Sequence, residues 1–492
     1  MTESYDKIIA ALMERISVLE RELAETRKLL EEKDAVIVAQ SARIKELEER
    51  LGKNSQNSSK PPSSDGYRKP RPVSNREKTE RKPGAQAGHP GAGLKMPETD
   101  RIEDVARRAE ECAGCPLSGS CAKVKPDAVR NEIDAEINIV LRRHYQESYV
   151  CPRRGGAVVS GKFPEGIASG VQYGAGIKAM AATLNTEGMM SFRRIHDFLS
   201  AALGLPVCTG TVSATVRELA RKVSGTARAV FDELLRSPVN NGDETGFRVS
   251  GKTYWLYSVC NGDFTFLSVQ EKRGAEGMRA VGFLPEYRGI LVSDCRGAYW
   301  KFPNLSHAIC NAHILRELKG IHENDPKQAW AEELRVLLRE MSHTRNKAAR
   351  DGASALPSET IRAFRTRYNA ILERAAGENP LPVRQPGKRG KAPKGKVRCL
   401  IDRLTAHRDE ALLSFEDLRV PFTNNRAEQS LRMAKVKGKV SGCTQTVSGT
   451  DDFAVIMSFI GSVKKHGINV LSAVKNAFWG NAYGVLFPAP TE

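Results

Sequence analysis

The chain has 492 residues, a length that favours about three domains. It carries 76 Lys and Arg against 58 Asp and Glu, a formal net charge of +18, which favours a polyanionic partner such as DNA over a role in solubility alone. The sequence has no apolar run of about 18 residues, no secretory signal pattern and only ten cysteines, which excludes a membrane-spanning protein and a disulfide scaffold and predicts a cytoplasmic, nucleoid-associated location.

Residues 1–51 carry a heptad repeat of apolar side chains with charged flanks and no proline or glycine. The first row of the repeat contains Ile9, Ile16, Leu23, Leu30, Ile37, Ile44 and Leu51, and the second contains Leu12, Leu19, Thr26, Lys33, Gln40 and Leu47. This pattern predicts a leucine-zipper-like coiled coil rather than one amphipathic helix packed on a globular core. Polar residues in the second row weaken its middle. We therefore expect a homodimer or a higher oligomer.

Residues 52–95 are rich in Ser, Asn, Pro, Gly, Lys and Arg and keep no apolar period. Such a composition is typical of a flexible linker. Its basic charge also suits a tether that lies along phosphates, and both descriptions can hold.

Thiols with metal-like spacing occur in the next segment, residues 96–160. A Cys-x-x-Cys pair and two later thiols can complete a tetrahedral shell around a structural Zn²⁺ ion, so we predict a small zinc-finger-like module. A redox Cys-x-x-Cys is less favoured because no βαβ pattern surrounds it. Arg154 stands where a fourth-ligand residue is expected, and His144 is a possible substitute. The candidate ligands are Cys112, Cys115, Cys121 and Cys151.

Residues 161–235 read as helices, with a turn at Gly204 between two of them. The spacing resembles a helix-turn-helix, and Arg193 and Arg194 are candidate DNA contacts. Two ordinary packed helices are the alternative, and for direct reading of bases that alternative is slightly favoured.

The catalytic interpretation begins with Asp243, which lies in an extended stretch. Two aromatic and β-branched runs follow, separated by Asn261-Gly262, which is a strong hairpin signal. After a short helix, residues 290–292 form an unbroken apolar run typical of a buried strand, and Asp294 follows it directly. Three strands in a meander, a helix and a further strand would bring Asp243 and Asp294 close together.

This order of elements is the ribonuclease H-like plan, in which a third carboxylate sits on a later helix. The stretch "VPFTNNRAEQSLR" places Glu428 at such a position. Asn425 would be the N-cap of that helix and Glu428 would close a capping box, a role compatible with metal binding. Three carboxylates can hold two divalent ions, Mg²⁺ or Mn²⁺, for phosphodiester chemistry. Solvated surface charge is the alternative for each acid taken alone.

The interval between Asp294 and Glu428 is too long for a loop and reads largely as helix. We therefore predict a catalytic domain over residues 236–475, interrupted by a helical insertion at about 315–400, and a C-terminal tail over 476–492. The basic stretch "RQPGKRGKAPKGKVR" within the insertion is either an arm of a DNA clamp or a linker.

Six stretches resemble the insertion sequence sixty-six family of DDE transposases, and they run nearly from end to end. They are "RLGKNSQNSSKPPSSD", "RKPGAQAGHPG", "GDETGFRV", "LVSDCRGAY", "CNAHILREL" and "VPFTNNRAEQSLRMAKVKGKVSGC". The resemblance implies an N-terminal zipper, a zinc-binding module, an interrupted ribonuclease H-like core and an Asp-Asp-Glu triad at Asp243, Asp294 and Glu428. Phe247 departs from the family, in which tryptophan is common at this position.

The resemblance also implies an activity and its partners. The family cleaves DNA at the terminal inverted repeats of the element, and the freed 3′-hydroxyl then attacks target DNA, with accessory proteins of the same element expected. A carboxylate cluster would repel DNA unless nearby cations reverse the local field. The candidates for this role are Arg426, Arg432, Lys435, Lys437 and Lys439. Cys310 and His313 could form a second zinc site, but a packed junction between a strand and a helix is favoured.

Two other functions remain open from the sequence. One is a non-catalytic zinc or helix-turn-helix regulator, or a domesticated transposase derivative that keeps the fold. The other is a plain metal-dependent nuclease, which would cut DNA without joining it. The overall expectation is a multidomain protein that mixes α+β and α/β organisation.

Overall fold

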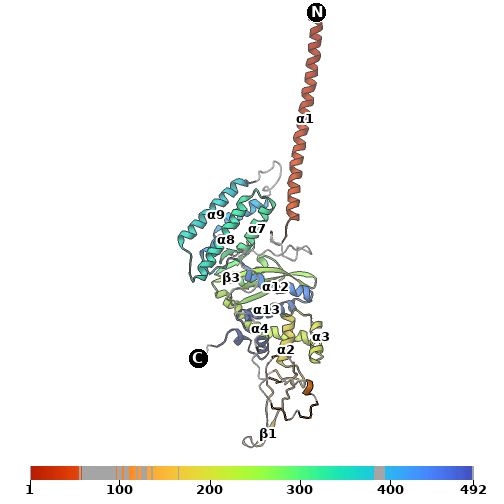
Figure 1. Ribbon diagram of the computed structural model, residues 1–492, viewed down its shortest axis with the longest axis vertical. Helices are drawn as coiled ribbons and strands as arrows, with labels where there is room; N and C mark the ends of the chain where they lie inside the picture. Colours follow the sequence, from red (N-terminus) through yellow and green to blue (C-terminus); the bar gives the residue numbers. More distant parts are fainter. Residues whose placement is uncertain are drawn as a thin grey trace. The chain divides into compact units, whose positions relative to one another are not determined.

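The structure is a computed structural model (Figure 1) in which the chain forms two compact units. One unit contains residues 1–72, 171–197 and 207–492, and the other contains 73–170 and 198–206. Most of the predicted linker, residues 52–95, lies outside the described residues. The first part of the basic stretch in the insertion, up to residue 393, also lies outside them. The described residues are 2–54, 57, 96, 102–104, 110–112, 114–117, 120–122, 130–134, 137–164, 166–381 and 394–489.

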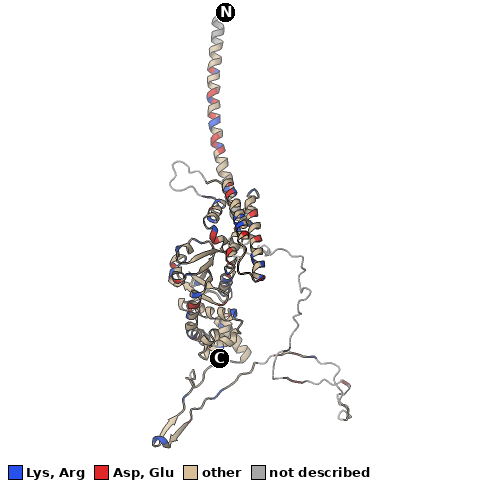
Figure 2. Cartoon of the chain, turned by 90° about the vertical axis from the view of Figure 1, so that its left-hand side faces the viewer, with Lys and Arg blue, Asp and Glu red and all other residues tan. Residues whose placement is uncertain are grey.

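Helix α1, Thr2–Leu51, runs without a break through the predicted heptads. The apolar residues of its first row are unpaired in the single chain: Ile9, Ile16 and Leu23 are 50–54% exposed. Acidic and basic residues are interspersed along the helix (Figure 2). An exposed apolar row between charged flanks is what a coiled-coil partner would cover, and the coiled coil itself stays a prediction.

The chain that leaves α1 contacts α7, Asn311–Asn324. The Nδ2 group of Asn57 donates to the Gly52 carbonyl (2.9 Å) and to Glu323 Oε2 (3.3 Å). A Cβ atom on Gly320 would lie 2.3 Å from the Asn57 carbonyl oxygen, so this close approach requires glycine. The beginning of the predicted linker is therefore attached to a helix.

The larger unit is built on a five-stranded sheet with the order β5-β4-β3-β6-β7. Strands β3, β4 and β5 form an antiparallel meander, whereas β6 is parallel to both β3 and β7. The predicted meander, helix and further strand are therefore confirmed, as is the hairpin at Asn261-Gly262. The bounds are β3 Val239–Val249, β4 Lys252–Cys260, β5 Thr265–Gln270, α5 Ala275–Val281, α6 Phe283–Glu286, β6 Ile290–Ser293 and β7 Ser306–Ile309.

Helices cover both faces of this sheet because the strand side chains alternate. Tyr257 and Val259 of β4 enter a core with helices α4 and α5, whereas Leu256 enters a second core with α12. Helix α4 is buried along one face over its whole length and packs against α13, which supports two packed helices over a free recognition helix. The bounds are α2 Ala175–Thr186, α3 Phe192–Leu203, α4 Thr209–Arg236, α12 Asn425–Val440 and α13 Val447–Lys465.

The segment expected as a C-terminal tail, residues 476–492, is partly helical. Helices α14, Val470–Phe478, and α15, Ala482–Leu486, pack into the same core as α4. Phe478 and Leu486 are both buried there. The sequence pattern missed α15 because one short helix carries too few turns to show a period.

Five helices between β7 and α12 form the predicted insertion, which extends further than expected at both ends. Their core contains the buried side chains of Trp330 and Tyr368. The backbone N–H of Asn311 donates to the carbonyl of Phe422 (3.1 Å), so the two ends of the insertion meet. The helices are α7 Asn311–Asn324, α8 Ala329–Arg350, α9 Ser358–Glu378, α10 Lys396–Ala406 and α11 Arg408–Glu416.

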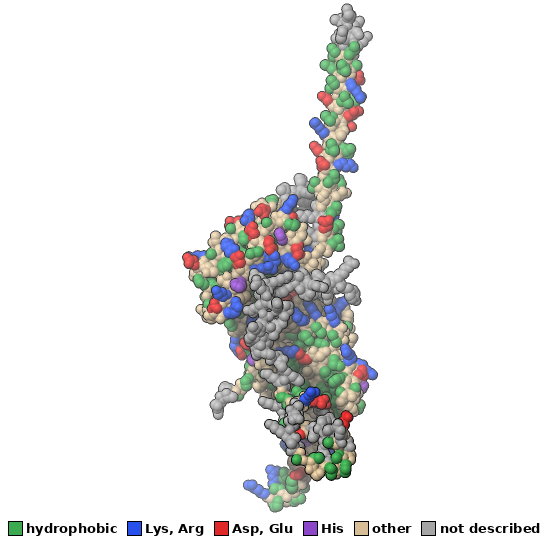
Figure 3. Space-filling model, viewed as in Figure 1, with side chains coloured by type: hydrophobic (Ala, Val, Ile, Leu, Met, Phe, Trp, Pro, Cys, Tyr) green, Lys and Arg blue, Asp and Glu red, His purple; other side chains and the backbone are tan. Residues whose placement is uncertain are grey.

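Charge on the insertion is mixed rather than segregated. Basic and acidic side chains are interspersed over the face shown in Figure 3. Two ion pairs among the described residues join α8 to α9, Arg367 with Glu340 at 2.8 Å and Arg374 with Glu333. On this face the positive charge does not gather into one patch.

The smaller unit contains a short antiparallel hairpin of β1, Ser148–Cys151, and β2, Ala157–Ser160. Two 3₁₀ turns, Glu110–Cys112 and Pro152–Arg154, carry or flank predicted zinc ligands. Among the described helices of the whole chain, none is long and apolar enough to cross a membrane.

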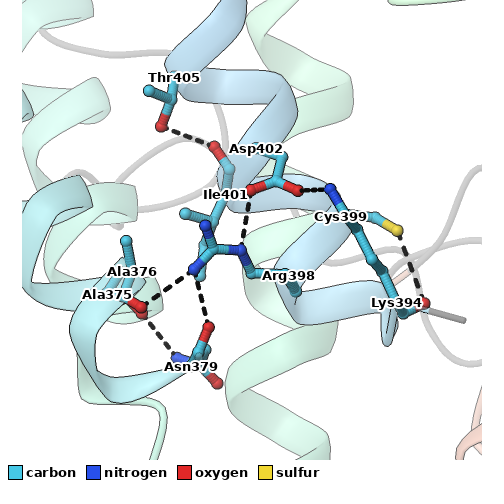
Figure 4. Close-up of polar contacts among 9 residues, drawn as sticks. All are labelled: Ala375, Ala376, Asn379, Lys394, Arg398, Cys399, Ile401, Asp402 and Thr405. Carbon is cyan, nitrogen blue, oxygen red and sulfur yellow. Dashed lines mark hydrogen bonds and ion pairs between the residues drawn. The ribbon is translucent and has the colours of Figure 1, made fainter. Parts of the chain in front are cut away.

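We expect Arg398 to stabilise the insertion, because its side chain donates hydrogen bonds to carbonyls at the C-terminal end of α9 (Figure 4). Its Nη1 donates to the carbonyls of Ala376 (3.0 Å) and Asn379 (2.9 Å), and its Nε donates to Asp402 (2.8 Å). Arg398→Ala should lower the stability of α9 and α10 by about 1–3 kcal/mol, because charged hydrogen bonds to helix-end carbonyls are lost. Hydrogen exchange of these two helices in the full chain measures the effect. Arg362→Ala, an exposed arginine on α9, is the control and should leave exchange unchanged.

Candidate active site

The parallel pairing of β3 with β6 brings two of the predicted catalytic carboxylates to one end of the sheet. The last paired residues are Asn241 and Val292. Asp243 and Asp294 each lie two residues further along, on strands that run in the same direction. The β3–β6 pairing therefore places both acids at the same level, as the sequence predicted.

Asn424 attaches the helix that carries Glu428 to this end of the sheet. Its Nδ2 donates to the Gly242 carbonyl (2.7 Å), its Oδ1 accepts from Asn241 (2.9 Å), and its backbone N–H donates to Cys310 Sγ (3.1 Å). Asn424 is buried, so these bonds are shielded from water. The start of α12 is thereby held beside β3.

The predicted capping box is wrong. Helix α12 begins at Asn425, with Asn424 in the N-cap position and no side-chain cap bond. The side chain of Asn424 is used for the sheet instead, and Glu428 lies one residue too late in the helix to close the box. The metal-binding interpretation of Glu428 does not depend on that box.

The pKa values of Asp243 and Asp294 are both raised, in part by the charges of neighbouring acids. Burial, the charge of Glu244 and then the charges of Asp294 and Glu428 raise the pKa of Asp243 to about 8. Burial, Glu244 and Glu428 raise the pKa of Asp294 to about 6. Among the described residues, Asp294 Oδ1 has no hydrogen-bond partner although it is buried. Neighbouring acids with raised pKa values and an unpaired oxygen fit a bound divalent cation.

Glu428 also faces the first turn of α7. Its Oε1 lies 3.9 Å from His313 Nδ1 and 3.8 Å from Arg316 Nη2. Cys310, His313 and Glu428 have ligand atoms all within 4.8 Å of one another, the only such group of metal-binding side chains in the described part of the chain. Asp243 and Asp294 are not members of that group. The expected packed junction is present, since Cys310 is fully buried, but it lies against the candidate site.

Burial gives Cys310 and His313 defined protonation states at neutral pH. It raises the pKa of the Cys310 thiol to about 11. Burial and the nearby charges of Arg316 and Arg403 lower the pKa of His313 to about 4, so the imidazole is neutral. His313 Nδ1 is buried without a hydrogen-bond partner among the described residues.

Glu244 is a residue of the site that the sequence interpretation missed. Its buried carboxylate accepts from Arg296 Nη1 (2.5 Å) and from the Tyr299 hydroxyl (2.8 Å). These partners follow Asp294 in the chain, so Glu244 ties the segment after β6 to β3. The sequence did contain a signal for Glu244, because it is a second acid directly after Asp243. Neighbouring side chains on a strand point to opposite faces, so Glu244 points away from Asp243.

The basic residues predicted on α12 fall on two faces of that helix. Arg432, Lys435 and Lys439 are exposed, and they follow Glu428 at spacings that keep one helical face. The prediction for Lys437 is wrong, because this side chain is buried. Its ammonium lies 5.1 Å from the centre of the Phe453 ring, and burial lowers its pKa to about 8. It is therefore not presented to DNA phosphates.

The other basic candidates are all at the surface. Arg426 is exposed in the first turn of α12. Arg193 and Arg194 are exposed on α3, where Arg193 pairs with Asp197 at 3.0 Å.

The candidate zinc thiols are not gathered into one cluster in the structure. Cys112 and Cys121 are exposed, and Cys115 and Cys151 are partly exposed. The zinc site therefore stays a prediction.

Comparison with known families identifies the class of protein. The model of the Transposase IS66 family matches residues 170–452, more than half of the chain, and the chain belongs to that family. Residues 10–95 match a second model, a family of unknown function (DUF6444). No curated protein matched the chain significantly. Membership makes the protein a transposase and implies that it binds DNA.

The raised pKa of Asp243 predicts how stability changes with pH when no metal is bound. The pKa is 3.8 for an ordinary aspartate and about 8 in the folded chain. Between these values the folded chain binds more protons than the unfolded chain, so the free energy of unfolding falls as the pH rises. Asp243→Asn cannot ionise, so at pH 8 without metal it should unfold at a higher temperature than the wild type. The difference should vanish near pH 4.

Thermal unfolding with a chelator measures this difference. Added MgCl₂ at pH 8 should then raise the unfolding temperature of the wild type more than that of the variant, because a cation relieves the repulsion. Asp351→Asn, which changes an exposed aspartate, is the control. Equal stability of the wild type and Asp243→Asn at pH 8 would contradict the raised pKa of Asp243.

Proposed function

We propose that the protein is the catalytic subunit of a DDE transposase. It would bind the terminal inverted repeats of its element, cleave the phosphodiester bond at each end and join the freed 3′-hydroxyl to target DNA. The observation that carries the proposal is that the β3–β6 pairing sets Asp243 and Asp294 at the same level, with the charges of Asp294 and Glu428 both raising the pKa of Asp243. The strand order, an antiparallel meander followed by two parallel strands, supports the ribonuclease H-like plan.

The donor set fits two magnesium or manganese ions. Two such ions lie about 3.5–4 Å apart, so the three carboxylates need not all reach one ion. When bound, the ions activate the attacking oxygen and stabilise the leaving oxygen. Asp243 and Asp294 would supply hard oxygen ligands and lose their protons on binding. Arg316, beside Glu428, has guanidinium donors of the kind that bind a phosphate oxygen.

The exposed basic face of α12 would guide DNA to these carboxylates. Arg432, Lys435 and Lys439 continue from Glu428 along one face, so a duplex lying on this face would bring its backbone towards the acids. The positive charge offsets the repulsion between the acids and the phosphates. The coiled coil over residues 1–51 would pair two subunits, one for each element end.

Glu428→Gln tests the catalytic assignment. The amide keeps the shape of the side chain but loses the charge that holds a cation, so strand cleavage and transfer should fall by at least about 100-fold, a loss of about 2.7 kcal/mol in transition-state stabilisation. Binding to oligonucleotides with element ends should be largely kept. Parallel gel-shift and strand-transfer assays separate the two.

Glu276→Gln, an exposed glutamate on α5, is the matched control and should be fully active. Unimpaired cleavage by Glu428→Gln would end the triad assignment. Binding without joined products from the wild type in Mg²⁺ or Mn²⁺ would favour a non-catalytic regulator, and cleavage without joining would favour a nuclease.

The double variant Arg432→Ala/Lys435→Ala tests the DNA face. Each lost phosphate contact should reduce the slope of log K against log salt by about 1, so the double variant should reduce it by about 2. Binding should weaken equally for element and unrelated sequences. Fluorescence anisotropy at several salt concentrations measures both effects. Arg362→Ala, on the insertion, is the control, and an unchanged slope in the double variant would remove this face from the interface.

A further inference from the structure

Beside the carboxylates lies a group of side chains with a different metal preference. Cys310 directly follows β7 and occupies the N-cap position of α7, and His313 lies in the first turn of that helix. Glu428 reaches them from α12. Their ligand atoms lie within 4.8 Å of one another, with His313 Nδ1 3.9 Å from Glu428 Oε1.

The chemistry of this group differs from that of Asp243 and Asp294. A thiolate, an imidazole and a carboxylate are the ligands that Zn²⁺ and Co²⁺ prefer, whereas Mg²⁺ prefers oxygen alone. His313 Nδ1 is buried without a hydrogen-bond partner among the described residues and faces Glu428 Oε1, so it is placed to act as a ligand atom. The backbone N–H of Asn424 already points at Cys310 Sγ, and such a donor stabilises a metal-bound thiolate.

We propose that Cys310, His313 and Glu428 form a second cation site that takes a zinc-like divalent ion. On binding, the Cys310 thiol gives its proton to solvent and the sulfur–metal bond forms, with no change of oxidation state. The site shares Glu428 with the proposed magnesium site. A zinc-like ion therefore draws Glu428 towards α7 and competes with magnesium for it. The inference rests on these side chains and does not require the triad to be correct.

Cobalt binding to the full chain tests the site without using activity. The predicted N-terminal zinc ligands would also bind cobalt, so the parent protein is C112S/C115S/C121S/C151S. Titration with Co²⁺ should produce a sulfur-to-cobalt charge-transfer band that saturates near one ion per chain. Cys310→Ala should abolish the band, and His313→Gln should weaken cobalt binding at least about tenfold.

Two controls separate this site from exposed thiols and from the proposed magnesium site. Cys399→Ser removes an exposed thiol on α10 and should keep the band. Asp243→Asn removes a proposed magnesium ligand and should also keep it, so failure of the triad is distinguishable from failure of this site. His313→Gln, at a partly exposed position, covers the case in which Cys310→Ala fails to fold, as judged by thermal unfolding. Absence of the band in the parent, or its survival in Cys310→Ala, would overturn the proposal.

Discussion

The candidate site depends on holding three carboxyl groups near one another where burial and neighbouring acids make their ionised forms unfavourable. Asp243 comes from β3, Asp294 from the residue after β6 and Glu428 from a distant helix; the charges of Asp294 and Glu428 raise the pKa of Asp243, and the charge of Glu428 raises the pKa of Asp294. No interaction between the acids themselves can hold them in place. The structure supplies that force elsewhere, through the backbone pairing of β3 with β6 and the bonds of Asn424. The free energy of folding thus maintains an arrangement in which ionisation of these acids is unfavourable, and a bound cation, as proposed above, would relieve that cost.

Two buried polar groups carry most of this positioning. Asn424 connects α12 to β3 and to Cys310, and Glu244 connects β3 to the segment after Asp294 through Arg296 and Tyr299. Both use hydrogen bonds in a shielded environment, where a lost partner leaves a costly unsatisfied group. Asn424 and Glu244 thus hold the backbone in place without a contribution from the side chain of Asp294, whose Oδ1 has no hydrogen-bond partner among the described residues.

The long insertion is accommodated because its ends meet beside the site. The bond from Asn311 to Phe422 closes it at its base, so the helices in between form their own core without changing the path of β7 or α12. The same closure brings the first turn of α7 against Glu428, which is how Cys310 and His313 reach the carboxylate. The two proposed metal sites would therefore share one glutamate.

The sequence by itself determined most of the strands and helices around the sheet, and it predicted that Asp243 and Asp294 would become neighbours. Asp243, Asp294 and the hairpin at Asn261-Gly262 were predictable because local alternation and turn residues report on local structure. The burial of Lys437, the packing of α15 and the role of Asn424 were decided only by the tertiary structure. Each depends on neighbours far away in the chain: a phenyl ring from α13, the core around α4, and the edge of β3. A pattern of residues along one segment carries no information about such partners, because their distances are set when the sheet and its helices pack.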